Sequence, residues 1–338
     1  MLKPESPDTM NMIPVEDLLH LRMPEEEACG WLQRLTPDQV SPELFRRFVE
    51  AIGQTGVPVP AIQQAVMDCC GTGGSGVSHF NTSTTVSFIL AAGGVSVVKF
   101  GNRAMSSPSG SFDFLESLGF PAEINIERIP DILDACGLAF LYAPQCYPVL
   151  QPFNQLRRRL GIRTLFNYLG PLLNPMQPAY RVLGVSHAGM QALISTYLSE
   201  STPSLQKAWV IHSNHNNTAE PAIGLDELAC HGHSSVHEVQ PQSRQTLEIH
   251  RQQTQPALNL PTLTPAENVN IFQALIEGED TESPYYQMVC LNAGAGFYVA
   301  GQAPTLENGE QLAQDLLAKG KVKETLNQCW RAYERANR

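Results

Sequence analysis

Residues 67–100 read MDCCGTGGSGVSHFNTSTTVSFILAAGGVSVVKF. An apolar segment over Met67–Cys70 is followed by a glycine-rich turn, a helix-like run over Ser83–Ala92 and a second strand-like run over Val95–Phe100. A strand, a crossover helix and another strand are the unit from which parallel sheets are built. The stretch therefore predicts an α/β fold with a mostly parallel central sheet.

Five further segments have the length and apolar content of strands in the same sheet. They are Leu138–Tyr142, Val182–Val185, Ala208–Ile211, His237–Val239 and Tyr286–Leu291. Residues 240–256 are rich in Gln and Arg, so we expect a solvated connection there, within which a strand is an alternative.

A small all-helical domain is expected over residues 13–66, after a flexible arm over residues 1–12. Helix start signals recur there, at Pro24-Glu25-Glu26-Glu27, Thr36-Pro37-Asp38 and Ser41-Pro42-Glu43. An apolar stripe is formed by Leu44, Phe45, Phe48 and Val49. Because a helix pair alone cannot bury such a stripe, it must pack against a second domain or another subunit. The α/β domain then spans residues 67–338, and residues 155–180 contribute a hinge to the helical domain.

Composition limits the class of protein. The chain has 338 residues, 43% of them hydrophobic, which suits a folded globular protein. Its formal net charge of −11 disfavours a nucleic-acid partner or an anionic membrane surface. The most apolar stretch, Val86–Val98, is shorter than the roughly 20 residues that a membrane span needs. The start of the chain lacks a secretory signal pattern, and the eight cysteines lack Cys-x-x-Cys spacing, so we expect reduced thiols and a cytoplasmic protein.

The loop over residues 71–84 has the chemistry of a phosphate cradle. Its glycines allow positive φ and close approach to a ligand, and the backbone N–H groups and following helix N-terminus attract anions. A glycine-rich connection without a ligand is the alternative. The loop is neither a Walker loop nor a dinucleotide fingerprint, because Gly-Lys-Ser/Thr is missing and the next strand leads to cations, Lys99 and Arg103, rather than to a carboxylate. These cations favour a polyanionic ligand.

Three further segments could complete an anion site. The turn Ser106–Ser111 is rich in hydroxyls, which suit either a second phosphate wall or an ordinary helix cap. The adjacent Asp226 and Glu227 suit either a solvated turn or, with the Ser83 hydroxyl, a Mg²⁺ site beside a pyrophosphate. Arg163 lies in a hinge-like stretch and could recognise a carboxylate or stack on a ring. We assign no metal role to the five histidines between positions 212 and 237, because they lack zinc-ligand spacing.

The ordered motifs resemble the anthranilate phosphoribosyltransferase family, a glycosyltransferase group with a nucleoside-phosphorylase-like fold. The resemblance rests on Gly71-Thr72-Gly73-Gly74, Asn81-x-Ser83-Thr84, Lys99-x-Gly101-Asn102-Arg103, Ser109-Gly110-Ser111-x-Asp113, Leu160-Gly161-x-Arg163-Thr164, Phe166-Asn167-x-Leu169-Gly170-Pro171-Leu172-x-Asn174-Pro175 and Gly224-Leu225-Asp226-Glu227. It implies a homodimer that associates through the helical domains. It also implies transfer of a phosphoribosyl group from 5-phosphoribosyl 1-diphosphate (PRPP) to the amine of anthranilate or a related aromatic amine, in tryptophan biosynthesis.

The resemblance also implies a role for individual residues. PRPP would be bound by Gly71, Gly74, Ser75, His79, Asn81, Thr82, Ser83, Thr84, Lys99, Gly101, Asn102, Arg103, Ser106, Ser107 and Ser111. The aromatic acceptor would contact Gly71, Asn102, Arg163, Phe100 and Tyr147. Two Mg²⁺ ions per site would be held by Ser83, Asp226 and Glu227.

The chain departs from the family pattern at five of these positions. The family usually has Asp at Ser75, Ser or Thr at His79, Ile at Thr82, and His at both Phe100 and Tyr147. A paralogue that binds a ligand or regulates without catalysis is therefore an alternative to an active enzyme. A nucleoside phosphorylase is a third reading, and the motif over residues 160–175 argues against it.

Overall fold

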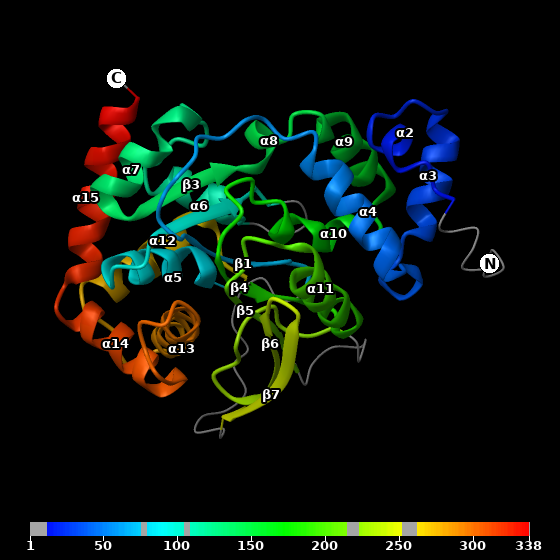
Figure 1. Ribbon diagram of the computed structural model, residues 1–338. Helices are drawn as coiled ribbons and strands as arrows, with labels where there is room; N and C mark the ends of the chain where they lie inside the picture. The colour runs from blue at the N-terminus through cyan, green and yellow to red at the C-terminus, as the bar shows by residue number, and fades with distance from the viewer. Residues whose placement is uncertain (1–11, 76–79, 105–108, 215–222, 252–261, 338) are drawn as a thin grey trace.

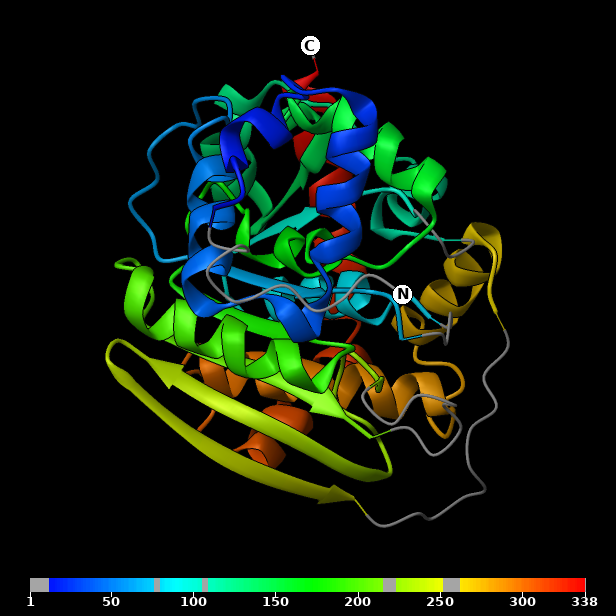
Figure 2. The same ribbon diagram turned by 90° about the vertical axis from the view of Figure 1, so that its right-hand side faces the viewer.

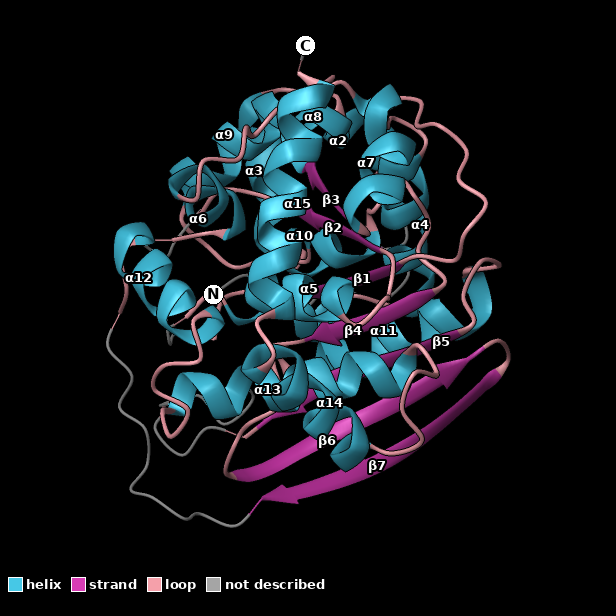
Figure 3. Cartoon of the chain, turned by 90° about the vertical axis from the view of Figure 1, so that its left-hand side faces the viewer, coloured by secondary structure: helices cyan, strands magenta, loops and turns pink. Residues whose placement is uncertain are grey.

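A seven-stranded sheet runs through the molecule, in the order β3-β2-β1-β4-β5-β6-β7 (Figures 1 and 3). The computed structural model describes residues 12–75, 80–104, 109–214, 223–251 and 262–337. The strands are β1 (Met67–Gly71), β2 (Val97–Gly101), β3 (Leu138–Tyr142), β4 (Tyr180–Gly184), β5 (Lys207–Ser213), β6 (Gly232–Gln240) and β7 (Ser243–Arg251). Strands β1 to β5 are parallel, whereas β6 and β7 are antiparallel to their neighbours. The prediction of a mostly parallel α/β sheet is confirmed.

The edge hairpin of β6 and β7 corrects the expectation for residues 240–256. A strand, β7, occupies most of that segment, so the alternative of a strand within the connection was the right one. Gln242, at φ +57, forms the tight turn between the two strands, and the hairpin lies along the lower edge of Figure 2. Most side chains of β7 are exposed, and β7 is an edge strand, since no further strand pairs with its outer side among the described residues. A polar composition is therefore compatible with a strand here.

The expected strand Tyr286–Leu291 is wrong. These residues lie within helix α13 (Pro284–Val299), whose first turn contains Pro284. Ser283 caps the helix, because its Oγ accepts from the N–H of Tyr286. The helix is buried over most of its length, so its apolar residues lie on all of its sides and do not form a stripe along one face. A short apolar run of this kind does not distinguish a buried helix from a buried strand.

Helices cover both faces of the sheet. The helices of the α/β region are α5 (Thr82–Ala92), α6 (Ser111–Ser117), α7 (Ile129–Cys136), α8 (Ala143–Cys146), α9 (Leu150–Leu160), α10 (Phe166–Leu169), α11 (Ala188–Ser201), α12 (Pro265–Ile276), α13, α14 (Leu306–Ala318) and α15 (Lys321–Ala336). Three-residue 3₁₀ turns occur at Ile126–Arg128 and Gly170–Leu172. In Figure 3, α5, α13, α14 and α15 lie in front of the sheet and α11 lies behind it.

The N-terminal helices form a separate layer on the right of Figure 1. They are α2 (Val15–Leu19), α3 (Glu25–Arg34) and α4 (Pro42–Gly53), and the expected start at Thr36 produces only a 3₁₀ turn, Pro37–Gln39. Ser41 Oγ caps α4 by accepting from the N–H of Leu44 at 3.1 Å. Residues 54–66 contain no helix and lead to β1. The boundary between two domains at residue 66 stays a prediction.

The apolar stripe of α4 packs within the same chain. The ring of Phe45 lies 6.0 Å from that of Tyr197 on α11, and Phe48 lies 5.2 Å from Phe166 on α10. Residues 155–180 also contact the helical layer, because the N–H of Leu165 donates to the carbonyl of Leu35 at 2.7 Å. The expected partners of the stripe were a second domain or another subunit. In the structure the stripe packs against α10 and α11 of the same chain.

A buried polar network anchors the segment that leaves α10. Asn174 Nδ2 donates to Asp68 Oδ2 at 2.9 Å and to the carbonyl of Val98 at 2.8 Å, which ties this segment to β1 and β2. Burial raises the pKa of Asp68, and the nearby Lys99 and the amide of Asn174 partly offset that effect. Arg181 is buried as well, and its guanidinium donates to the carbonyl of Pro171 at 2.9 Å.

All eight cysteines are free thiols. Among the described residues, no helix has both the length and the apolar character to cross a membrane.

Candidate active site

The glycine-rich loop lies where the order of the strands reverses. The chain runs from β1 to β2 and β3 on one side, and then returns to β4 and β5 on the other side of β1. In open α/β sheets, ligands bind outside the carboxyl ends of the strands at such a point. The loop directly follows Gly71, the last residue of β1, and so occupies this position.

Backbone conformation and hydroxyl contacts fix the first part of the loop. Gly73 and Gly74 have φ values of +67 and +78, which residues with a side chain rarely adopt. The N–H of Thr72 donates to the carbonyl of Gly184 at 3.0 Å. Ser186 secures the next residue, because its Oγ donates to the carbonyl of Gly73 at 2.6 Å.

The Asp226 side chain contacts this loop directly. Its Oδ2 accepts from the N–H of Gly73 at 2.7 Å. A Cβ on Gly71 would collide with the Asp226 carboxylate, and a Cβ on Gly184 would collide with the Asp226 backbone. Two glycines in neighbouring strands therefore allow a carboxylate 153 positions away in sequence to reach the loop.

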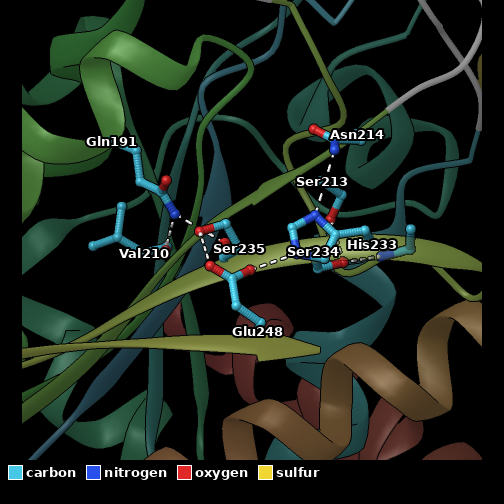
Figure 4. Close-up of polar contacts among 9 residues, drawn as sticks. Gln191, Val210, Ser213, Asn214, His233, Ser234, Ser235 and Glu248 are labelled. Carbon is cyan, nitrogen blue, oxygen red and sulfur yellow. Dashed lines mark hydrogen bonds and ion pairs between the residues drawn. The ribbon is translucent and has the colours of Figure 1, made fainter. Parts of the chain in front are cut away.

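The turn that carries Asp226 and Glu227 is attached to the end of β5. Ser213 and Leu225 exchange backbone hydrogen bonds at 3.1 and 2.8 Å, and Ser213 Oγ donates to the carbonyl of Glu227 at 2.6 Å. Ser213 Oγ also lies 2.6 Å from Ser234 Oγ on β6 (Figure 4). The ends of two strands thus orient the carboxylate pair.

Lys99 is almost fully buried behind the loop. Its Nζ donates to the carbonyl of Cys69 at 2.7 Å and to Ser83 Oγ at 3.1 Å, so its charge lies beside the first turn of α5. Thr84 Oγ1 is also buried there, without a hydrogen-bond partner within the described ranges. A fixed cation, a hydroxyl and the N-terminus of α5 together suit a phosphate group.

The second loop contacts the first. Asn81 Nδ2 donates to Ser109 Oγ at 2.9 Å. Asp113 accepts at Oδ2 from the N–H groups of Ala104 and Gly110, both at 2.8 Å, so one carboxylate oxygen binds the described residues on both sides of this loop. Ser111 Oγ donates to the carbonyl of Asn102 at 3.1 Å, and Gly101 leaves room for Ser111. Three of the expected residues, His79, Ser106 and Ser107, lie outside the described residues.

Arg103 is already paired in the structure. Its guanidinium donates to both carboxylate oxygens of Glu116, at 2.7 and 2.9 Å, and to the Tyr142 hydroxyl at 3.0 Å. This hydrogen bonding raises the pKa of Arg103 and lowers the pKa of Glu116. A phosphate on Arg103 would have to share the guanidinium with Glu116, a competitor that the sequence motif does not reveal.

The residues expected on the acceptor side fall into two groups. Arg163 is exposed and lies against the loop, since a Cβ on Gly74 would be 3.6 Å from its Cζ. Phe100 and Tyr147 are buried and contact each other edge to face, with ring centroids 6.1 Å apart. The Tyr147 hydroxyl donates to the carbonyl of Leu173 at 2.7 Å, and burial raises its pKa. The two positions where the family usually has histidine thus form one aromatic pair.

Two other departures from the family pattern are internal. Ser75 is buried at the end of the described part of the loop, and Thr82 is buried in the first turn of α5, where its Oγ1 lies 3.5 Å from the carbonyl of Phe80. Whether the expected residues bind PRPP stays a prediction for every one of them.

Sequence reasoning missed Ser186, Ser213, Asn268 and Asn292. Asn268 Oδ1 accepts from the N–H of Asn81 at 2.8 Å, and Asn292 contacts the backbone of Leu228. A single Ser or Asn in a strand end or helix carries no spacing pattern. Only the three-dimensional structure identifies these contacts.

The donor set fits a hard divalent cation. Asp226 and Glu227 are partly buried and belong to a turn that Ser213 fixes. The Ser83 hydroxyl, expected as a third ligand, accepts from Lys99 Nζ, and its place in the metal site stays a prediction. No cluster of three or more His, Cys, Asp or Glu side chains suited to a metal occurs in the part of the chain that the structure describes. Two carboxylates are the small protein share that Mg²⁺ takes when phosphates and water complete its coordination.

The histidines of β6 and β7 have other partners. His233 Nε2 is hydrogen-bonded to Glu248 Oε2, and its Nδ1 lies 3.4 Å from Asn214 Nδ2 (Figure 4). Its ring also lies 4.7 Å from that of His250 on the opposite strand. His237 Nδ1 lies 2.9 Å from Ser195 Oγ.

The fold and the loops at the carboxyl ends of the parallel strands define an α/β protein whose candidate site has the chemistry that suits a phosphorylated ligand. Residues 63–323 match the model of a glycosyl transferase family, a/b domain. Curated anthranilate phosphoribosyltransferases from Syntrophomonas wolfei and Synechococcus elongatus are 33% and 35% identical, over 91% and 93% of this chain and 88% and 89% of theirs. The chain therefore belongs to the anthranilate phosphoribosyltransferase family, and it is a phosphoribosyltransferase.

Solved structures agree with this assignment. The anthranilate phosphoribosyltransferase of Thermus thermophilus has a TM-score of 0.82 and 30% identity, with 98% of this chain and 97% of that chain covered. The Saccharomyces cerevisiae enzyme in complex with PRPP and Mg also has a TM-score of 0.82, at 21% identity, with 98% and 94% covered. The second likeness shows the fold alone.

Proposed function

We propose that this enzyme transfers the phosphoribosyl group of PRPP to the amine of anthranilate and releases pyrophosphate, a step of tryptophan biosynthesis. The observation that carries the proposal is the contact between the Asp226 carboxylate and the N–H of Gly73, which joins the carboxylate turn to the phosphate loop. The relatives' names supply the substrates, and the yeast enzyme has been solved with PRPP and Mg and with 4-fluoroanthranilate.

The chain's own residues would act mainly on the leaving group. As the bond from C1 of the ribose to pyrophosphate breaks, positive charge develops on C1 and negative charge on pyrophosphate. Lys99, the loop N–H groups and the Thr84 hydroxyl would stabilise the negative charge, and a fixed arrangement makes such donors effective. Ser83, Asp226 and Glu227 would hold Mg²⁺, which supplies further positive charge to the pyrophosphate. No nucleophilic side chain or covalent intermediate is required.

The acceptor would be placed by Arg163 and Asn102. Arg163 is exposed beside Gly74, so its guanidinium can bind the carboxylate of anthranilate while the amine faces C1. The aromatic pair of Phe100 and Tyr147 would contribute an apolar wall for the ring of the acceptor. A wall of this kind favours aromatic amines, and anthranilate is the member that the relatives' names indicate.

Three finer properties belong to the same proposal. They are two Mg²⁺ ions per site, a homodimer formed through the helical layer and a cytoplasmic location. Because the stripe of α4 is used within the chain, the dimer would form through other surfaces of that layer. Size-exclusion chromatography with light scattering tests the dimer, and a monomeric mass would contradict it.

The function is tested by following the loss of anthranilate fluorescence with PRPP and Mg²⁺. Pyrophosphate release is measured in parallel with a panel of aromatic amines. We expect turnover with anthranilate that requires both PRPP and Mg²⁺. Turnover with a different amine only would correct the acceptor, whereas no turnover with any amine and no PRPP binding by calorimetry would overturn the proposal.

A further inference from the structure

Two buried asparagines of the C-terminal helices contact the backbone of the two site loops. Asn268, on α12, is fully buried, and its Oδ1 accepts from the N–H of Asn81 at 2.8 Å. Asn292, on α13, is 5% exposed and contacts Leu228 twice. Its Oδ1 accepts from the N–H of Leu228 at 2.9 Å, and its Nδ2 donates to the carbonyl of Leu228 at 3.1 Å.

These contacts are placed directly beside the residues expected to bind the ligand. Asn81 precedes the first turn of α5, which carries Ser83 and Thr84. Leu228 immediately follows Asp226 and Glu227, and Ser213 holds the same turn from the β5 side. Asn292 therefore completes a clamp on the carboxylate turn, with one side from the sheet and the other from α13.

Burying an amide in an apolar helix is costly unless its polar atoms are paired. Both asparagines meet this need with one bond inside their own helix region and the rest to a loop. Asn268 Nδ2 donates to the carbonyl of Thr264 at 2.9 Å, and Asn292 Nδ2 also donates to that of Met288 at 2.9 Å. Each amide thus connects its own helix region to the backbone of a site loop.

We propose that Asn268 and Asn292 are positioning residues for two different parts of the site. Asn268 sets the phosphate loop at the start of α5, and Asn292 sets the Asp226–Glu227 turn. The inference rests on the proposed function, since it assigns the first loop to PRPP and the turn to Mg²⁺.

Separate measurements of the two ligands test the inference. PRPP affinity is measured by calorimetry at saturating Mg²⁺, and the Mg²⁺ requirement is taken as the concentration that gives half-maximal PRPP binding. Loss of a partner outside the metal's own ligands typically weakens metal binding by about 10- to 100-fold. We therefore expect Asn292→Ala to raise the Mg²⁺ requirement about 10-fold or more, with a much smaller change in PRPP affinity at saturation. Asn268→Ala should weaken PRPP affinity and leave the Mg²⁺ requirement unchanged.

Isosteric variants guard against simple misfolding. Asn268→Asp keeps an oxygen for the N–H of Asn81 and loses only the donor to the carbonyl of Thr264 in its own helix region. Its PRPP affinity should therefore exceed that of Asn268→Ala, and the unfolding midpoints of both variants check that they are folded. Asn292→Asp keeps the acceptor for the N–H of Leu228 but loses the donor to its carbonyl, so the Mg²⁺ requirement should stay raised. Ser195→Ala, which removes buried hydrogen bonds to Gln191 and His237, is the matched control and should alter neither ligand's binding.

Equal losses for both ligands in both alanine variants would overturn the inference, because a purely structural role predicts no division between PRPP and Mg²⁺. An Asn292→Asp variant with the wild-type Mg²⁺ requirement would also overturn it. If the wild-type protein binds no PRPP at all, the proposed function itself fails, and that result is distinct from either outcome above.

Discussion

Two glycines shape this site because the side chains that they lack leave room for Asp226. Gly71 and Gly184 are neighbours across β1 and β4, and Asp226 lies against both of them. The motif around Gly71 predicted a contact with PRPP and the acceptor, and the room that Gly71 leaves for Asp226 is visible only in the structure. Gly184 belongs to no motif, and its role is visible only once the turn from residue 224 is seen to cross β4.

Gly184→Ala should displace the carboxylate turn. The added methyl group would collide with the Asp226 backbone, and overpacking of this kind typically costs about 1–3 kcal/mol. We expect a folded protein whose kcat/KM falls at least about 10-fold and whose Mg²⁺ requirement rises. Gly30→Ala on α3 is the control, since a Cβ there meets nothing within 4 Å. Equal activity of the two variants would contradict the arrangement of Asp226 described above.

The elements that sequence patterns identified best are those with strong boundaries. A glycine-rich turn separates the strand and the helix expected over residues 67–92, and the structure contains β1 and α5 there, although α5 is buried over most of its length. Helix α13 was mistaken for a strand because burial on all sides removes its periodicity. The pairing of Arg103 with Glu116 was missed for another reason, since α6 brings the carboxylate from 13 positions away without a helical or strand spacing.

Phe48→Ala tests the packing of α4 on the α/β part. Phe48 is fully buried against Phe166, and truncation of such a ring costs about 3–5 kcal/mol. Chemical denaturation should show a loss of this size, and a much smaller loss for Met12→Ala, whose side chain is 78% exposed. A loss below about 1 kcal/mol for Phe48→Ala would mean that the stripe is not covered within the chain.

His237 should make the hairpin edge sensitive to acid. Burial, followed by the nearby Arg244, lowers the pKa of His237, although Glu248 opposes this shift. The unfolded chain, with a His pKa of about 6.5, therefore binds the proton first as the pH falls. The stabilising contribution is present above that pH and is lost below it. Thermal unfolding of the wild type and of His237→Gln between pH 7.5 and 5.5 should show a smaller pH dependence in the variant, and identical slopes would refute this account.

At the scale of the whole molecule, a chain with a net charge of −11 is proposed to bind a polyanion. The net negative charge of the chain does not prevent this, because the charge near the ligand is positive. Lys99 is buried behind the loop, and a cation is expected at Asp226 and Glu227. The fold class and the order of the motifs were predictable from the sequence. The contact between Gly73 and Asp226 was not predictable, because it depends on the complete sheet. The contacts of α12 with Asn81 and of α13 with Leu228 depend in addition on how the helices cover that sheet.

The most direct test of the central claim is calorimetry of PRPP binding with and without Mg²⁺, on the wild type and on Asp226→Asn combined with Glu227→Gln. The account predicts Mg²⁺-dependent binding by the wild type. In the double variant it predicts loss of that dependence and of turnover, with little change in the unfolding midpoint, because both substitutions preserve side-chain shape. Mg²⁺-dependent binding that survives unchanged in the double variant would contradict the claim that the carboxylate turn and the phosphate loop form one site.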